Sequence, residues 1–177
     1  MITKMDRRTL LSALAGAPFL RAGRELNVDC AIIGGGTGGC AAALAALRNG
    51  LRVVMTEETD WVGGQLTSQA VPPDEHPWIE SFGGTALYRR YRNAVRRYYV
   101  DNFPVTDAIR ANPAFNPGGG LVSRLTHEPP VSLAVLETML RPYVSAGQLV
   151  LLLKHEATAA YVDKDRVKFV TVRDLET

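Results

Sequence analysis

Residues 28–58 read VDCAIIGGGTGGCAAALAALRNGLRVVMTEE, and this pattern predicts a strand, a glycine turn, a helix and a second strand in succession. The apolar run 28–33 has the length of a buried strand and enters the glycines without a linker. The helix is expected over residues 37–49, because small apolar residues fill it and Asn49-Gly50 provides a C-terminal stop. The second strand is expected over residues 51–56. A βαβ unit of this kind predicts an α/β fold built on a parallel sheet.

The glycines between the first strand and the helix have the spacing of a dinucleotide-binding fingerprint. Gly34, Gly36 and Gly39 are followed by Ala43 and Gly50, which completes the pattern GxGxxGxxxAxxxxxxG. The first glycine permits a tight turn, the second lets the backbone approach a pyrophosphate, and the third lets the helix lie close to the strand. The free N–H groups and the dipole of the first helical turn attract phosphate. The pattern therefore predicts a dinucleotide site rather than a glycine-rich turn that binds nothing.

An acidic residue stands at the end of the second strand, where such a site needs one. Glu57 comes 23 residues after Gly34, and a carboxylate there can accept hydrogen bonds from both hydroxyl groups of an adenosine ribose. The fingerprint alone does not distinguish FAD from NAD. The cofactor-binding residues expected from this unit are Ile33, Gly34, Gly36, Thr37, Gly38, Gly39, Glu57 and Glu58.

A second glycine pair follows the acidic residue, in the turn VGGQ at residues 62–65. Together with Asp29, the fingerprint and Glu57, this turn resembles the FAD-dependent oxidoreductases whose flavin domain has the glutathione-reductase-like form of the dinucleotide-binding fold. The resemblance implies that FAD is the cofactor. It also implies contacts to the pyrophosphate and the ribityl chain from Gly63, Gly64 and Gln65.

The resemblance further implies the elements that complete the domain. A helix that starts near residues 126–130 and an apolar run at residues 149–153 are expected to supply a helix and a third parallel strand. Beyond that strand, the backbone of Ala157 would contact the adenine. Residues 159–162 and 167–172 are expected to begin an antiparallel meander. The expected fold class is therefore α/β, a Rossmann-like FAD/NAD(P)-binding domain with a parallel sheet and a partial antiparallel meander.

The resemblance covers nearly all of residues 27–177, which we expect to form the N-terminal part of a FAD-binding domain. Members of the family continue into a substrate-binding region and a late strand that ends in an Ala-Thr-Gly or Gly-Asp motif, and neither motif is present here. The family implies two-electron chemistry at the flavin, with a small-molecule substrate and a separate electron acceptor. We expect the domain to be incomplete at its C-terminus and inactive by itself. The alternatives are an NAD-binding dehydrogenase domain and a non-catalytic dinucleotide-binding module.

Residues 1–26 are expected to be a leader outside the fold. Basic residues precede an apolar segment, Leu10 to Leu20, in the order typical of an export signal. The sequence RRTLL at residues 7–11 further resembles a twin-arginine signal, which would send the protein to the periplasm. Asp6 before the arginine pair and Pro18 after Ala15-Gly16-Ala17 depart from that pattern. A leader that stays in the cytoplasm is therefore the alternative.

The composition argues against several partners. The chain carries 20 basic and 18 acidic side chains, but residues 27–177 contain 15 basic and 16 acidic ones, a net charge of −1. This charge gives no electrostatic reason to bind nucleic acid or an anionic membrane. No apolar run reaches the ~18 residues that cross a bilayer. The three histidines and two cysteines have no metal-ligand spacing, so no metal site is expected.

Two further segments have both a functional and a structural interpretation. Arginines and tyrosines alternate in residues 86–100, a mixture that suits RNA. However, apolar and tyrosine residues at positions 87, 91, 95 and 98 recur at helical spacing, which favours a helix packed through its tyrosines with its arginines in solvent. His76 lies in a proline-containing loop and is our only catalytic candidate, as a general acid or base. The alternative is a loop histidine without a catalytic role.

Overall fold

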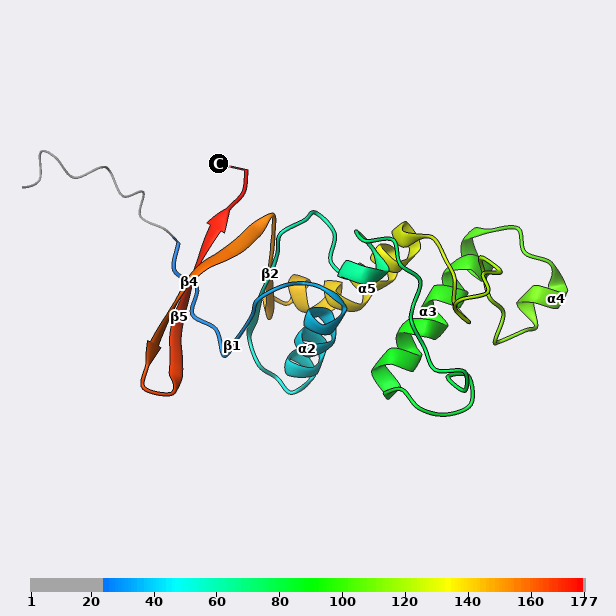
Figure 1. The fold of residues 1–177 in the computed structure, drawn as a ribbon, viewed down its shortest axis with the longest axis horizontal. Coiled ribbons are helices and arrows are strands. Elements are labelled where there is room, and N and C mark those ends of the chain that lie inside the picture. The colour runs from blue at the N-terminus through cyan, green and yellow to red at the C-terminus, as the bar shows by residue number, and fades with distance from the viewer. Residues whose placement is uncertain (1–23, 177) are drawn as a thin grey trace, which may run out of the picture.

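The strand, helix and strand predicted over residues 28–58 are all present in the structure, a computed structural model that describes residues 24–176. The segment that resembles a twin-arginine signal lies outside the described residues. Figure 1 follows the chain from its described start to its end. In chain order the elements are β1 (Cys30–Ile32), α2 (Thr37–Arg48), β2 (Val53–Glu57), the 3-10 helix η1 (Gly64–Leu66), α3 (Ala86–Asn102), α4 (Asp107–Arg110), α5 (Pro129–Ser145), β3 (Leu149–Leu153), β4 (His155–Asp163) and β5 (Arg166–Asp174).

The first three strands form a parallel sheet in the order β1-β2-β3, so that β2 lies in the middle. Cys30 lies opposite Val53, and Val53 lies opposite Leu149. The predicted third parallel strand at residues 149–153 is confirmed. Because the strands are parallel, their carboxyl ends share one edge of the sheet. The glycine turn after β1 and Glu57 at the end of β2 both lie at this edge.

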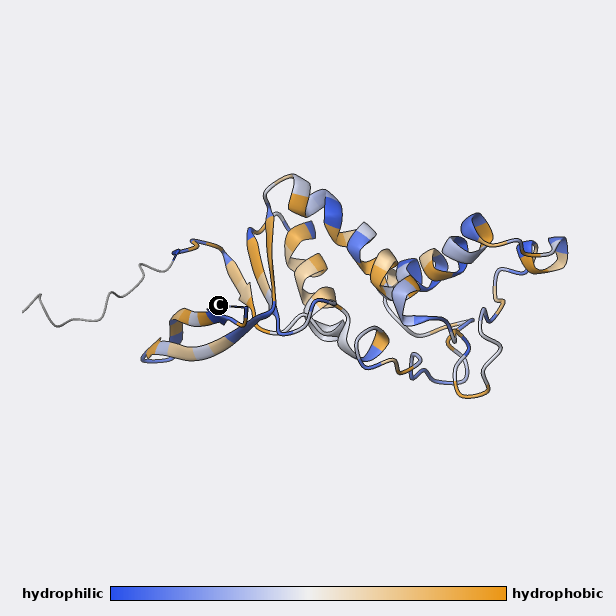
Figure 2. Cartoon of the chain, turned by 90° about the horizontal axis from the view of Figure 1, so that it is seen from above, coloured by the Kyte–Doolittle hydropathy of each residue, from blue (hydrophilic) through white to orange (hydrophobic). Residues whose placement is uncertain are grey.

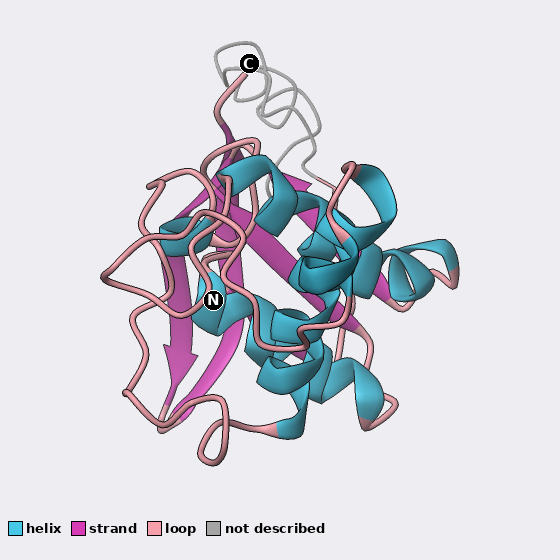
Figure 3. Cartoon of the chain, turned by 90° about the vertical axis from the view of Figure 1, so that its right-hand side faces the viewer, coloured by secondary structure: helices cyan, strands magenta, loops and turns pink. Residues whose placement is uncertain are grey.

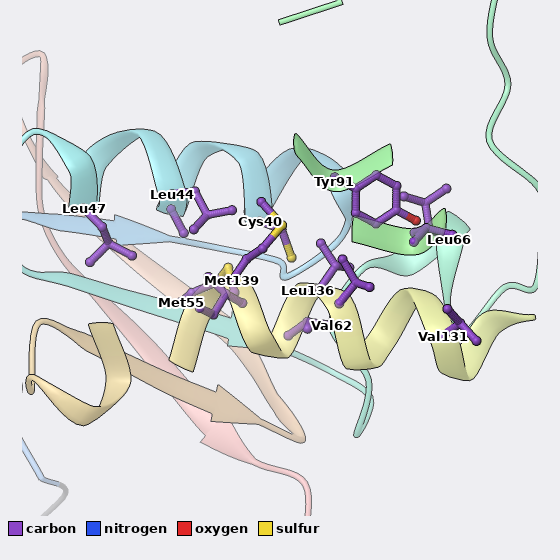
Figure 4. Close-up of a cluster of buried hydrophobic side chains, with 14 of the residues drawn as sticks. Cys40, Leu44, Leu47, Met55, Val62, Leu66, Tyr91, Val131, Leu136 and Met139 are labelled. Carbon is purple, nitrogen blue, oxygen red and sulfur yellow. The ribbon is translucent and has the colours of Figure 1, made fainter. Parts of the chain in front are cut away.

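Helices α2 and α5 lie against each other and against the parallel sheet, and their apolar side chains form the core (Figure 4). Ala43, at the position where the fingerprint expects a small residue, has no exposed surface. Burial of each large apolar side chain contributes about 1.5–3 kcal/mol to folding. The core side chains labelled in the close-up are Cys40, Leu44, Leu47, Met55, Val62, Leu66, Tyr91, Val131, Leu136 and Met139.

Strands β4 and β5 form an antiparallel hairpin that extends away from the helices (Figures 1 and 2). They confirm the predicted start of a meander, and both strands are longer than the predicted segments. Tyr161 and Phe169 face each other across the hairpin with their rings stacked, 5.0 Å between centroids. Both rings are more than half exposed, at 54% and 58%.

Helix α3 confirms the predicted tyrosine-rich helix, and Arg90 and Arg97 are exposed as predicted, but two other arginines of the helix do not lie in solvent. Figure 3 views the molecule from the end that contains α3 and α4, and helices and loops lie there in front of the strands. Arg92 and Arg96 are buried, at 2% and 5% exposed, and pair with the carboxylates of Glu75 and Glu80. The helical period identified the packed face, but it gave no sign that the preceding loop supplies two acidic partners. Buried guanidinium groups need such partners because an unpaired buried charge is strongly destabilising.

Membrane spans and metal sites were searched for among residues 24–176. Within that range, no helix is both long and apolar enough to span a bilayer. The same residues contain no group of three or more histidine, cysteine or acidic side chains arranged to hold a metal ion.

Candidate dinucleotide site

The glycine turn after β1 has the backbone geometry that the fingerprint predicts. Gly34 has a φ of +95°, a left-handed conformation that residues with a Cβ rarely adopt. A Cβ on Gly39 would overlap the Gly34 carbonyl oxygen, so α2 can approach the turn this closely because residue 39 is glycine. A Cβ on Gly36 would meet no atom within 4 Å. The first and third glycines therefore serve the fold, whereas the space at Gly36 is open to a ligand.

The second glycine pair docks onto the first turn, although it lies about 26 residues later in the chain. Gly63 forms an isolated parallel bridge with Gly36, and its N–H donates to Gly35 O at 2.8 Å. The Thr37 hydroxyl donates to Gly63 O, also at 2.8 Å. A Cβ on Gly64 would lie 3.1 Å from the Gly36 Cα, so the two backbones come this close because residue 64 is glycine. The fold thus joins the two predicted glycine motifs into one surface.

Helix α2 begins at this surface without a capping side chain. Gly36 is the N-cap residue, no side chain bonds to the first turn, and no acidic residue lies in that turn. The Thr37 hydroxyl is directed to Gly63 O rather than to the helix. The first-turn N–H groups and the positive end of the helix dipole therefore suit an anion at the open space by Gly36. A dinucleotide pyrophosphate fits this arrangement in both charge and room.

Glu57 is held at the end of β2 by residues that the sequence pattern did not single out. Its Oε1 accepts hydrogen bonds from the Thr59 N–H (2.9 Å) and the Thr59 hydroxyl (2.8 Å). Within residues 24–176, no hydrogen bond reaches Oε2, which leaves that oxygen as an acceptor for ribose hydroxyl groups. The Thr56 hydroxyl accepts from the Gly34 N–H at 3.1 Å and ties β2 to the glycine turn. Lone threonines carry no recognisable signal in one sequence, and neither contact could be predicted from it.

The other predicted site residues lie at varying positions around this surface. Gln65 is exposed and directly follows Gly64, Ile33 is exposed just before Gly34, and Glu58 is exposed beyond Glu57. Ala157 lies exposed on β4, opposite Val172 of β5. Lys154, three residues earlier, donates its backbone N–H to Thr59 O at 3.2 Å, so the start of the hairpin lies beside the segment that follows Glu57.

His76 lies in an exposed loop among aromatic residues. Its ring stands 5.7 Å from that of Phe82 and 6.3 Å from that of Trp78, and its Nδ1 accepts the Trp78 N–H. Gly83 packs against the same ring, where a Cβ would overlap Nε2. No acidic side chain within the described residues bonds to the imidazole. The ring is thus positioned by aromatic packing, and nothing in the structure assigns it a catalytic role.

The thiol of Cys40 is expected to be inert while the protein is folded. It is 1% exposed and donates to Gly35 O at 3.2 Å, directly behind the glycine turn. Burial, with a smaller contribution from the Glu57 carboxylate, raises the pKa of this thiol to about 12, so almost no thiolate forms at mildly alkaline pH. In a thiol-labelling experiment, Cys40→Ala should react like the unmodified chain. Cys30→Ala should react only when denaturant is added, and rapid labelling of folded Cys30→Ala would contradict the burial of Cys40.

Comparisons with known proteins identify the family of the chain. A family model described as FAD dependent oxidoreductase matches residues 29–177. No curated protein matches the chain. Among solved structures, OTEMO in complex with FAD and NADP is 18% identical with a TM-score of 0.42, and the match covers 87% of this chain and 24% of that one. Mycobacterium smegmatis Sdh1 in complex with UQ1 is 17% identical with a TM-score of 0.44, covering 81% and 30%. Thermovibrio ammonificans THI4 is 16% identical with a TM-score of 0.43, covering 98% and 58%.

These structural similarities are too low to assign any chemistry to this chain. The chain spans between 24% and 58% of the length of the three solved chains named above. The family match, in contrast, takes in all the described elements and both glycine turns. The chain therefore belongs to the FAD-dependent oxidoreductase family.

Proposed function

We propose that the chain binds the adenosine diphosphate part of FAD and forms the N-terminal, flavin-binding portion of a FAD-dependent oxidoreductase. The observation that carries the proposal is the docking of Gly63 and Gly64 onto the turn at Gly35 and Gly36. A βαβ fingerprint alone would suit NAD equally well. A second glycine turn placed on the first is the feature that favours FAD, in agreement with the family.

Three features of the predicted site bind separate parts of FAD in this proposal. The N–H groups at the start of α2 bind the pyrophosphate, Oε2 of Glu57 accepts from the adenosine ribose, and the backbone of Ala157 contacts the adenine. FAD, when bound, supplies a two-electron redox centre that acts on a small-molecule substrate and a separate electron acceptor. The full set of proposed contacts is Ile33, Gly34, Gly36, Thr37, Gly38, Gly39, Glu57, Glu58, Gly63, Gly64, Gln65 and Ala157.

A competition titration tests which part of which cofactor is bound. Binding of FAD to the chain is followed by isothermal titration calorimetry, and the titration is repeated with ADP, FMN or NAD+ present as a competitor. We expect ADP to displace FAD and FMN to compete far less, because most of the proposed contacts lie on the adenosine and the pyrophosphate, and only those of Gly63, Gly64 and Gln65 extend to the ribityl chain. Tighter binding of NAD+ than of FAD would favour the dehydrogenase alternative. Absence of binding by FAD, ADP and NAD+ would overturn the proposal.

Glu57→Gln separates the ribose contact from the fold. The glutamine carbonyl can still accept both bonds from Thr59, but its amide places a donor where Oε2 was an acceptor. Hydrogen bonds to charged groups contribute about 1.5–3 kcal/mol, so FAD and ADP should each bind roughly 10- to 100-fold more weakly and by the same factor. Unequal factors would mean that Glu57 does not act on the adenosine shared by the two ligands. An unchanged unfolding temperature is the control.

A further inference from the structure

A cavity of ≈ 260 Å³ opens beside α3 and shares no lining residue with the dinucleotide site. At about 30 Å³ for each water molecule in the liquid, this is room for roughly eight waters or one small organic acid. The lining is strongly cationic for a chain whose body is close to neutral. The residues that line it are Glu80, Arg89, Arg92, Asn93, Arg96, Pro113 and Ala114. We propose that this cavity binds a small oxyanion, a carboxylate or a phosphate group.

Two of the lining arginines are fixed in place by glutamate carboxylates, one buried (Glu75, 2% exposed) and one partly exposed (Glu80, 31%). Arg92 pairs with both Glu75 and Glu80, and Arg96 donates to Glu80 through both terminal nitrogens, at 2.6 and 3.2 Å. Arg96 also donates its Nε to the Phe115 carbonyl at 2.8 Å. Their guanidinium groups are therefore held rigidly, with little side-chain entropy left to lose when a ligand binds.

The third arginine leaves the cluster with one positive charge in excess. Arg89 donates only to backbone carbonyls, those of Ile79 and Gly83, and no described residue offers it a carboxylate. Three arginines thus meet two glutamates, Glu75 and Glu80. An anion that enters the cavity would balance this charge. Neutral carbonyl partners leave Arg89 able to turn part of its guanidinium group toward such an anion.

The remaining lining residues favour the same class of ligand. Asn93 adds an amide that has no hydrogen-bond partner within residues 24–176, and Pro113 and Ala114 form an apolar wall. The planar fork of a guanidinium group donates two parallel hydrogen bonds to two oxygens of a carboxylate or phosphate, a geometry that a single-atom anion such as chloride cannot reproduce. This cavity is therefore suited to a polyatomic oxyanion on a short apolar body.

An NMR titration tests the proposal. The chain is titrated with acetate, succinate or inorganic phosphate, and chloride is varied in compensation so that the ionic strength stays constant. We expect saturable shifts of the Asn93 side-chain amide and of the backbone amides of Arg89 and Ala114. Tightest binding of succinate would indicate that the ligand is an organic acid, and tightest binding of phosphate would indicate a phosphate ester. Shifts confined to the amides of Thr37, Gly38 and Gly39 would place the anion at the dinucleotide site instead and would overturn the proposal.

A pair of variants on α3 distinguishes a site from general attraction. Arg89→Met should weaken binding at least 10-fold, because it removes the unbalanced charge, whereas Arg90→Met removes an equal charge from an exposed position and should have no effect. Equal weakening by the two variants would show attraction by surface charge alone. The two proposals can fail separately. If the unmodified chain binds the oxyanion but not FAD, the proposed function is wrong and the oxyanion site stands.

Discussion

Replacement of Gly36 by valine is expected to weaken FAD binding by about 100-fold while the fold is retained. The added methyl groups would occupy the open space that the pyrophosphate needs, and they would deny it the charge-assisted hydrogen bonds of the first helical turn. Two such bonds at about 1.5 kcal/mol each account for a loss of this size, since 1.4 kcal/mol is tenfold. No atom lies within 4 Å of a Cβ at this position, and Gly36 has a φ of −60°, which valine can adopt. We expect the free energy of unfolding to fall by about 1 kcal/mol, because valine is a poorer N-cap than glycine.

Gly39→Ala is the matched control from the same turn. Its methyl group would overlap the Gly34 carbonyl oxygen and lie 3.0 Å from the Gly34 carbonyl carbon, so the backbone must move. Overpacking of this kind costs about 1–3 kcal/mol or more. Urea unfolding and a flavin titration should therefore show that Gly39→Ala loses stability and binding together, whereas Gly36→Val loses chiefly binding. Undiminished FAD affinity in Gly36→Val would remove Gly36 from the site.

Arg92→Met is expected to destabilise the protein by about 3–5 kcal/mol, the range found when one partner of a buried ion pair is removed. The side chains of Arg92 and Glu75 are each 2% exposed. Without Arg92, the Glu75 carboxylate retains only the Tyr88 hydroxyl, which donates to Oε1. Its Oε2 already lacks a hydrogen-bond partner among the described residues. The substitution would therefore leave a buried negative charge almost unpaired.

Arg97→Met on the same helix is the control for charge and helix propensity. Arg97 pairs with Asp101 one turn later, but their side chains are 73% and 47% exposed, and exposed pairs contribute little to stability. Urea unfolding of both variants should show a large loss of stability for Arg92→Met and a minor one for Arg97→Met. Similar losses would indicate that the carboxylates of Glu75 and Glu80 do not depend on Arg92.

The βαβ unit could be predicted from sequence because local rules determine it. Strand, turn and helix follow one another within residues 28–58, and Gly34 and Gly39 perform the steric roles that their spacing indicates. The parallel pairing of the first two strands follows from the same unit, whereas the third parallel strand and the start of the meander were expected from the resemblance to the family. Contacts between segments that are distant in the chain were harder to predict from the sequence. That Gly63 would bridge to Gly36 depends on tertiary packing, which spacing alone does not specify.

The arginines of α3 show where sequence reasoning was wrong. A guanidinium group is exposed unless another segment supplies a carboxylate, and one sequence does not reveal which loop will fold over which helix. Glu75 and Glu80 belong to a loop with no periodic pattern, so their pairing with Arg92 and Arg96 could not be read from the helix itself. The same hidden pairing creates the cationic cavity beside α3.

The most direct test of the account is an amide NMR titration of the chain with FAD, which locates even weak binding. We expect saturable shifts at Gly36, Gly38, Gly39, Gly63 and Gly64, with no change at Gly119. Shifts that avoid both glycine turns, or no shifts at any concentration of FAD, would contradict the central claim that the two turns form one dinucleotide site.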